Sequence, residues 1–205
     1  MTSREEFLER VRNALGDQPA VPVPPDVPDD LLRLASTDED LLERFEHEAV
    51  AVGMEVERVK DPASGVVAFL KRESVSTVAL GVEDDDLRAR VRQGLHDAGI
   101  EIVEDLFACD AGVTDVHAAL AETGTLVLHP GANQSRGVSL APMLHVAIAD
   151  TARVLPDMID YVANCDAGER GARILVTGPS KTADIEGELV CGVHGPGRVR
   201  ILLVG

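Results

Sequence analysis

The 205-residue sequence has few aromatic side chains and few basic ones. It contains one Tyr, four Phe and no Trp, and its 19 Lys and Arg face 36 Asp and Glu, a formal net charge of −17. Nucleic-acid binding needs clustered basic side chains to neutralise phosphates and aromatic rings to stack on bases. These two shortages exclude nucleic acid as an expected partner.

Closely spaced cysteines and long apolar runs are also missing. The three cysteines, Cys109, Cys165 and Cys191, are far apart in sequence, whereas iron–sulfur clusters and structural zinc sites use closely spaced ones. We therefore expect no metal or other cofactor in this chain, and a reducing compartment. No apolar run is long enough to span a membrane, and the charged first residues lack the apolar core of a signal peptide. A cytoplasmic protein is expected.

Apolar residues make up 45% of the chain, which is enough for a sizeable core, and the length favours one compact domain. Acidic residues concentrate in residues 1–106, whereas most of the 18 glycines lie in residues 107–205. Glycine permits special backbone angles and close approach of the chain. The first half is therefore predicted to form solvated helices, and the second half tight loops between strands.

The N-terminal residues predict a helix followed by a stiff linker. Ser3 and Glu6 have the spacing of a capping box, and Gly16 follows the apolar stripe at the usual place for a helix end. Residues 17–28 are rich in proline, which disfavours helix and central strand. The predicted organisation is a helical arm over 1–28 and a single α/β domain over 29–205. The arm could pack on its own domain or on another subunit, so a homo-oligomer is possible.

After the linker, helical periods alternate with short apolar runs. Helices are predicted after Thr37, around 65–71 and over 83–98. The predicted strands are MEVERV, TVALG, IEIVED, TLVLH, HVAIA, RILVTG and VRILLV. This alternation indicates βαβ units around a mostly parallel sheet. Ligands of such sheets bind beyond the carboxyl ends of the strands, and the polar segments 121–137, 139–148 and 177–197 are predicted to lie there.

The turn after RILVT could bind an anion. Gly178, Ser180, Lys181 and Thr182 combine a flexible backbone with hydroxyls and an ammonium, which suits a carboxylate or a phosphate. The turn is no Walker P-loop, because no glycine directly precedes the lysine. In the alternative interpretation, Ser180 or Thr182 caps a short helix.

Three acidic residues are candidates for acid–base chemistry. Asp184 and Glu186 flank one residue, so in an extended chain both carboxylates point to the same side. They could equally be ordinary surface charges. Glu122 precedes a Gly-Thr turn, where it could serve as base or nucleophile towards a carbonyl compound, or could hold the turn by binding backbone amides.

Two histidines are candidates as well. His145 begins an apolar strand, and His194 lies between two glycines in a segment open to a cleft. A neutral imidazole there could be a base or a metal ligand. No metal-binding spacing of histidines occurs, so a metal is disfavoured. Cys191 has apolar neighbours, which favours an inert thiol.

Four segments together resemble the LUD domain, specifically the lactate utilization protein C (LutC) family: AETGTLVL, SLAPMLHVAI, TGPSKTADIEGELVCGVHGP and VRILLVG. The resemblance covers nearly the whole chain. It implies a Rossmann-like three-layer α/β/α domain of the NagB/RpiA/CoA-transferase-like type. It also implies a three-protein system that oxidises L-lactate to pyruvate, in which the partner proteins carry the iron–sulfur clusters. This chain, with its sparse cysteines, would be the cluster-free subunit.

The motif positions define a predicted site. Its catalytic candidates are Glu122, His194 and Asp184. Its substrate-binding candidates are Thr123, Thr125, Ser139, His145, Gly178, Ser180, Lys181, Thr182 and Glu186. Lys181, and with it Arg136, would hold the carboxylate of the substrate. Two other functions stay open: a stand-alone enzyme acting on a sugar phosphate or an acyl-CoA, by analogy of fold alone, and a scaffold whose loops bind a partner protein.

Overall fold

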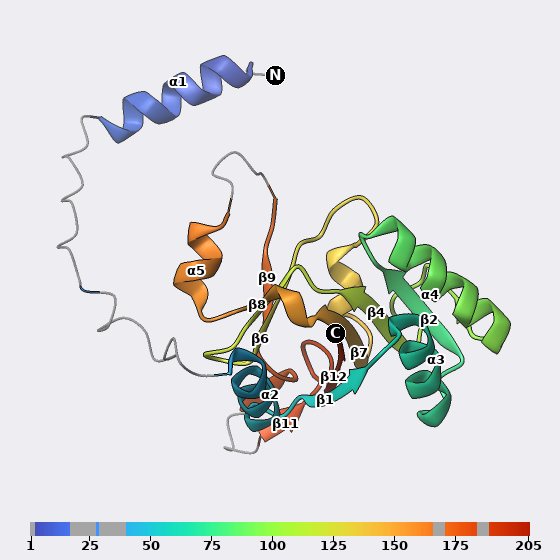
Figure 1. Cartoon of the computed structure of the whole chain (residues 1–205). Coiled ribbons are helices and arrows are strands. Elements are labelled where there is room, and N and C mark those ends of the chain that lie inside the picture. The colour runs from blue at the N-terminus through green and yellow to red at the C-terminus, as the bar shows by residue number, and fades with distance from the viewer. Residues whose placement is uncertain (1–2, 17–27, 29–39, 166–170, 184–188) are drawn as a thin grey trace. The chain divides into compact units, whose positions relative to one another are not determined.

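The computed structural model describes residues 3–16, 28, 40–165, 171–183 and 189–205 (Figure 1). Asp184, Glu186 and most of the predicted linker lie outside the described residues. The chain divides into two units, Met1–Arg33 and Leu34–Gly205. The predicted domain boundary after residue 28 stays a prediction.

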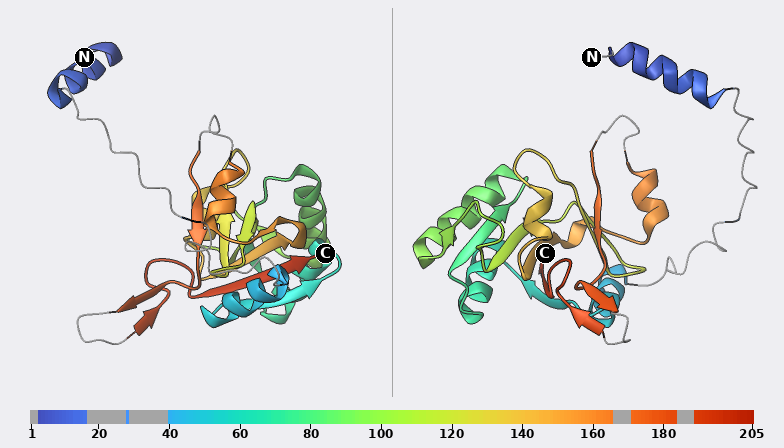
Figure 2. Two further views of the ribbon diagram at one scale, coloured as in Figure 1. Left: turned by 60° about the vertical axis from the view of Figure 1, so that its left-hand side comes forward. Right: turned by 180° about the vertical axis from the view of Figure 1, so that it is seen from behind.

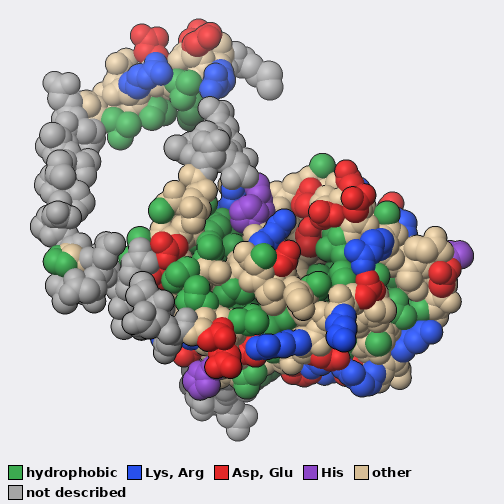
Figure 3. Space-filling view, in the orientation of Figure 1, with side chains coloured by type: hydrophobic (Ala, Val, Ile, Leu, Met, Phe, Trp, Pro, Cys, Tyr) green, Lys and Arg blue, Asp and Glu red, His purple; other side chains and the backbone are tan. Residues whose placement is uncertain are grey.

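The first unit contains α1 (Arg4–Leu15), which forms as the capping box predicts. The backbone N–H of Glu6 donates to the Ser3 hydroxyl at 3.2 Å, and the Ser3 N–H donates to the Glu6 carboxylate at 2.8 Å. No residue of α1 is buried. Its apolar side chains gather on one face of the helix and are exposed (Figure 3): Phe7, Val11 and Leu15.

The second unit is built on a six-stranded sheet in which every neighbouring pair is parallel. In spatial order the strands are β1 (Glu55–Val59), β12 (Arg198–Val204), β7 (Leu144–Asp150), β4 (Ala111–Asp115), β2 (Thr77–Gly81) and β3 (Glu101–Ile102). The central strands β7 and β12 are almost continuously apolar, because layers cover both of their faces. The predicted α/β fold with a parallel sheet is confirmed.

Helices cover one face, and a helix and a second sheet cover the other (Figures 1 and 2). On the first face α3 (Pro62–Arg72) and α4 (Asp85–Ala98) lie side by side and bury residues such as Phe69 and Leu95. On the second face α2 (Leu41–Ala51) buries Phe45 against Leu126 and Ile201. The three helices begin alike, each after an aspartate whose carboxylate accepts first-turn N–H groups.

The second sheet has four strands, in the order β8 (Val154–Leu155), β5 (Ala118–Leu120), β6 (Thr125–Leu128) and β9 (Ile174–Val176). Pairs β5–β6 and β6–β9 are antiparallel. The short helix α5 (Met158–Ala163) packs on β5 and β8. The segments TLVLH and RILVTG thus form strands of this second sheet rather than of the parallel one. A short buried apolar run has the same pattern in either sheet, so periodicity does not assign it.

The remaining elements among the described residues are the antiparallel pair β10 (Lys181–Ala183) and β11 (Leu189–Cys191) and the 3₁₀ turns η2 (Arg136–Ser139) and η3 (Thr151–Arg153). Strands β4 and β5 lie in a stretch where no strand is predicted. Among the described residues, no helix has the length and apolarity to cross a membrane.

Candidate functional site

Two of the predicted loops lie at the amino ends of parallel strands. Residues 139–143 run into β7 and residues 192–197 run into β12, whose first residues pair as Leu144 with Arg198. The loops 121–124 and 177–180 do follow strands, but those strands belong to the second sheet. The prediction that the segments lie beyond the carboxyl ends of parallel strands is therefore wrong for these loops, because it assumed one sheet. It holds for residues 131–134 of the first segment, where the Asn133 N–H donates to Glu83 and Gln134 donates to the Asp115 carbonyl at the ends of β2 and β4.

Part of the predicted site does come together, at the end of the second sheet. The Thr125 hydroxyl lies 2.7 Å from the hydroxyls of both Thr123 and Thr177, which links β6 to β9. Gly124 has φ +63°, and a Cβ there would lie 2.3 Å from the backbone nitrogen of Ala49. The turn therefore packs directly against the backbone of α2, and only glycine fits.

Lys181 lies against the carboxyl end of the same helix. Its Nζ donates to the carbonyl of Val52, the C-cap residue of α2, at 3.1 Å. Gly178 has φ +95°, and a Cβ there would lie 2.7 Å from the same carbonyl oxygen of Val52. The ammonium thus offsets the negative end of the α2 dipole. Its predicted contact with a substrate carboxylate stays a prediction.

Ser180 ties this turn to the loop that carries His194. The Ser180 N–H donates to the carbonyl of Pro196 at 2.8 Å, and the Gly192 N–H donates to the carbonyl of Ser180 at 2.9 Å. His194 is exposed on this loop, and Thr182 lies in the β10–β11 hairpin. The structure therefore joins the two most motif-rich segments through their backbones.

The other predicted residues lie deeper. His145 is completely buried, with Nε2 2.9 Å from the Thr114 hydroxyl, and burial lowers its pKa to about 4. Ser139 is also buried and donates to the carbonyl of Arg136 at 3.2 Å. Glu122 is half-buried, and its N–H donates to the carbonyl of Pro156. Their predicted roles in binding and catalysis stay predictions.

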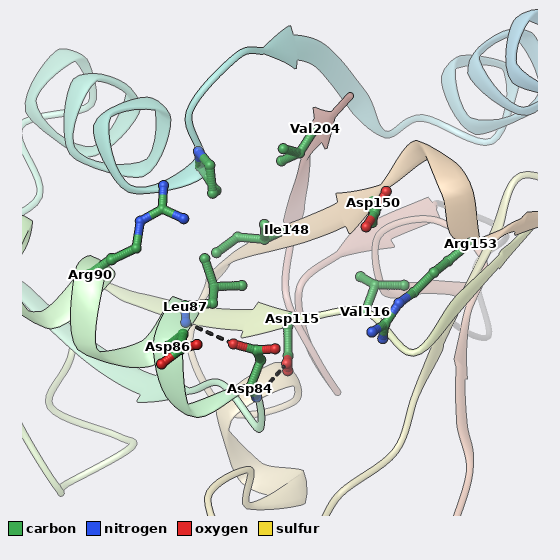
Figure 4. A pocket seen from close by; sticks show the side chains of 11 residues that line it. Asp84, Asp86, Leu87, Arg90, Asp115, Val116, Ile148, Asp150, Arg153 and Val204 are labelled. Atoms are coloured by element: carbon green, nitrogen blue, oxygen red, sulfur yellow. Dashed lines mark hydrogen bonds between the residues drawn. The ribbon is translucent and has the colours of Figure 1, made fainter.

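A pocket of about 270 Å³ lies at the opposite, carboxyl edge of the parallel sheet (Figure 4). This is the edge where open parallel sheets bind ligands. Apolar side chains form one part of its lining: Leu87, Val116, Ile148 and Val204. The charged side chains that line it are Asp84, Asp86, Arg90, Asp115, Asp150 and Arg153. None of the predicted site residues that the structure describes lines this carboxyl-edge pocket.

Backbone amides hold the acidic wall of the carboxyl-edge pocket in place. The Asp115 carboxylate accepts the N–H groups of Glu83 and Asp84, each at 3.1 Å, and Gln134 donates to the Asp115 carbonyl at 3.0 Å. Asp84 in turn accepts the N–H of Leu87 and caps α4. These carboxylates are therefore fixed acceptors, and part of their charge is offset by N–H dipoles.

Arg153 faces that wall across the carboxyl-edge pocket. Asp150 accepts the N–H of Ala152 at 2.9 Å, which starts the turn η3 that carries Arg153. The Arg153 side chain extends towards the middle of the pocket (Figure 4). The other arginine of the lining, Arg90, pairs with Asp61. Among the described residues, Arg153 has no hydrogen-bond or ion-pair partner. The pocket thus offers one available guanidinium opposite ordered carboxylates.

Sequence reasoning missed the charged residues of this pocket. Asp150 directly follows the predicted strand HVAIA, and a polar residue at the end of a buried strand is the signal that could have found it. Asp115 could not be identified from the sequence as a residue at a strand end, because no strand was predicted over β4. Arg153 lies on a turn whose position depends on the second sheet.

Comparison with known proteins identifies the fold family. Residues 42–204 match the family model of the LUD domain. The chain belongs to the LUD domain family. Its resemblance to lactate utilization protein C is also confirmed. The LUD chain is 35% identical over 146 residues to lactate utilization protein C of Halalkalibacterium halodurans, a match that covers 68% of this chain and 56% of that protein.

Two further comparisons extend over most of the LUD chain. Lactate utilization protein C of an Exiguobacterium species is 27% identical over 222 aligned positions, covering 100% of this chain and 96% of that protein. A crystal structure of a DUF162 family protein from Deinococcus radiodurans has a TM-score of 0.60 at 22% identity, covering 81% of this chain and 97% of that one. This structure supports the fold alone.

Proposed function

We propose that this chain is the cluster-free component of a multi-protein system that oxidises L-lactate to pyruvate, with the iron–sulfur clusters in its partner proteins. One observation carries the proposal: the match to lactate utilization protein C of the Exiguobacterium species covers 100% of this chain and 96% of that protein. The three cysteines of this chain are free and scattered, which suits a component that holds no cluster.

The carboxyl-edge pocket is the proposed place for the small carboxylate. Arg153 would bind the carboxylate group, since a planar guanidinium matches its two oxygens. Asp150 or Asp115 would accept the hydroxyl hydrogen of a 2-hydroxy acid. Val116 and Ile148 offer an apolar surface for a methyl group. A volume of about 270 Å³ suits a ligand of this size.

Reconstitution tests the proposed function. The chain is combined with the cluster-bearing partner proteins from the same organism, and reduction of an electron-accepting dye by L-lactate is measured. We expect dye reduction to need all components. Full lactate-dependent reduction without this chain would overturn the proposal.

A charge-removing variant tests the proposed pocket. Arg153→Gln should lose the stabilisation of the chain by L-lactate in a thermal-shift measurement. The matched control is Arg92→Gln, which changes an exposed arginine of α4 that does not line the pocket. Equal stabilisation of the two variants by lactate would mean that the lactate carboxylate does not bind at Arg153. That outcome would contradict the proposed pocket and not the proposed function, which the reconstitution tests separately.

A further inference from the structure

The helix α1 has an exposed apolar face, although it has the caps of a well-formed helix. Phe7 and Val11 are exposed on it, and Figure 3 shows apolar side chains along one side of α1 and charged side chains along another. A helix of 12 residues is only marginally stable by itself in water, and helices in proteins gain most of their stability by packing such a face. We therefore expect another surface to cover this face.

The apolar residues of α1 have the heptad spacing of a two-stranded coiled coil. Leu8, Val11 and Leu15 are separated by three and then by four residues, which are the steps between the central heptad positions a and d. Phe7 and Ala14 each directly precede an a residue, at position g. They widen the apolar stripe on one flank.

The other flank of the stripe has opposite charges at its two ends. Glu5 lies in the first turn and Arg12 in the last turn, and each directly follows a d residue, at position e. In an antiparallel pair of helices the e residues of one helix lie beside the e residues of the other. Glu5 of each copy then meets Arg12 of the other, which gives two ion pairs. The flank of α1 is therefore complementary in charge to that of a second, reversed α1.

A parallel pair lacks this complementarity. It would place Arg4, which is at position d, against Arg4 of the other copy inside the seam, where like charges repel. It would also place Arg12 beside Phe7 rather than beside Glu5. In the antiparallel pair the two Arg4 side chains lie at opposite ends of the seam, so this repulsion is absent.

We propose that α1 is an interaction surface for a second copy of this chain and pairs with α1 of that copy in antiparallel orientation. Leu8 of each copy lies opposite Val11 of the other. The helix has three glutamates and three arginines, so two copies can approach there without the repulsion expected from a net charge of −17. The proposal does not depend on the proposed function, because α1 contributes no residue to the carboxyl-edge pocket.

Sedimentation equilibrium of the full-length chain tests the pairing, at concentrations up to ~0.5 mM because two short helices pair weakly. We expect a monomer–dimer equilibrium. V11D puts a carboxylate into the apolar seam and should raise the Kd of the dimer about tenfold or more. The matched control N13D adds the same group on the exposed polar face and should leave the Kd unchanged. Equal melting of the second unit in both variants verifies that it is folded.

Charge-exchanged variants test the antiparallel orientation. E5R has arginine at both e positions and R12E has glutamate at both, so each variant alone should be monomeric at low salt. An equimolar mixture of the two should regain the dimer, because every arginine of one copy meets a glutamate of the other. The control pair E9R and R10E makes the same changes of charge away from the seam. These two should dimerise alone as well as in their mixture.

A monomer at every concentration would overturn the proposal, and so would a dimer that V11D does not weaken. Failure of the mixed E5R and R12E chains to dimerise would contradict the antiparallel pair. A monomeric chain whose V11D variant binds the cluster-bearing partner proteins less tightly would assign the apolar face to those proteins and would also overturn the proposal. The lactate reconstitution and the Arg153 variant are measured separately, so their failure can be told from any of these outcomes.

Discussion

The imidazole of His145 is completely buried, and its Nε2 forms a hydrogen bond with the Thr114 hydroxyl. Burial lowers its pKa from 6.5 to about 4. Between these two values the unfolded chain binds a proton at this residue and the folded chain does not. The stability that His145 confers is therefore complete above about pH 6.5 and is lost as the pH falls towards 4.

The corresponding prediction compares the native chain with H145Q by urea denaturation at several pH values. Between pH 6.5 and 4 the native free energy of unfolding should fall by an additional ~1 kcal/mol per pH unit. The variant lacks this titration, so the difference between the two proteins should shrink on acidification. A difference that stays constant with pH would show that His145 does not titrate in this range.

A second prediction at this scale concerns Gly124. Gly124→Ala would place a Cβ 2.3 Å from the α2 backbone, so we expect a loss of more than about 3 kcal/mol in the free energy of unfolding. The control is Gly99→Ala, which has a similar φ of +72° but no atom within 4 Å of its Cβ position. It should lose only about 1 kcal/mol, from backbone strain. Equal losses of unfolding free energy in the two variants would mean that the contact of the new Cβ with α2 does not destabilise the fold.

At the scale of elements, the carboxyl end of α2 depends on Lys181. Lys181→Met removes the donor to the Val52 carbonyl and should lower the free energy of unfolding by about 1 kcal/mol. Lys60→Met is the control, because Lys60 is an exposed lysine with no such contact. Urea denaturation of both variants measures the difference. Identical midpoints would rule out a capping role for Lys181.

The elements that the sequence predicts best are those with local signals. The helix α1 follows from its capping box and apolar stripe, α2, α3 and α4 from helical periods, and β1, β2, β7 and β12 from apolar runs between them. No local sequence signal distinguishes TLVLH or RILVTG from a strand of the parallel sheet. Their place in a second sheet is decided by the pairing of β6 with β5 and of β6 with β9, which is a tertiary effect.

The same limit applies to the site. The hydroxyl network of Thr123 and Thr125 and the joining of Ser180 to the His194 loop fit the prediction that the motif segments gather. The carboxyl-edge pocket was missed, because its residues come from the ends of β4, β7 and β12, from the first turns of α4 and from the turn η3. Only the strand order brings these residues together.

At the scale of the whole molecule, the two units contribute unequally to stability. Phe7 of α1 is 58% exposed, whereas Phe45 of α2 has no exposed surface. Phe7→Ala should therefore leave the melting temperature unchanged, and Phe45→Ala should cost about 3–5 kcal/mol. Calorimetry of the two full-length variants compares the loss of a Phe side chain at an exposed position and at a buried one. A similar loss in both would mean that α1 is part of the cooperative unit.

The strand order also dictates when the domain can be completed during synthesis. β12 is the last of the six parallel strands to leave the ribosome, yet its place is between β1 and β7. Glu55 of β1 can form its ion pair with Arg198 only after a further 143 residues have been synthesised. Until then the sheet of the nascent chain has a gap between β1 and β7, and the core beneath α2 lacks Val199, Ile201 and Leu203. Such a late, distant closure slows folding and leaves open strand edges to be protected in the meantime.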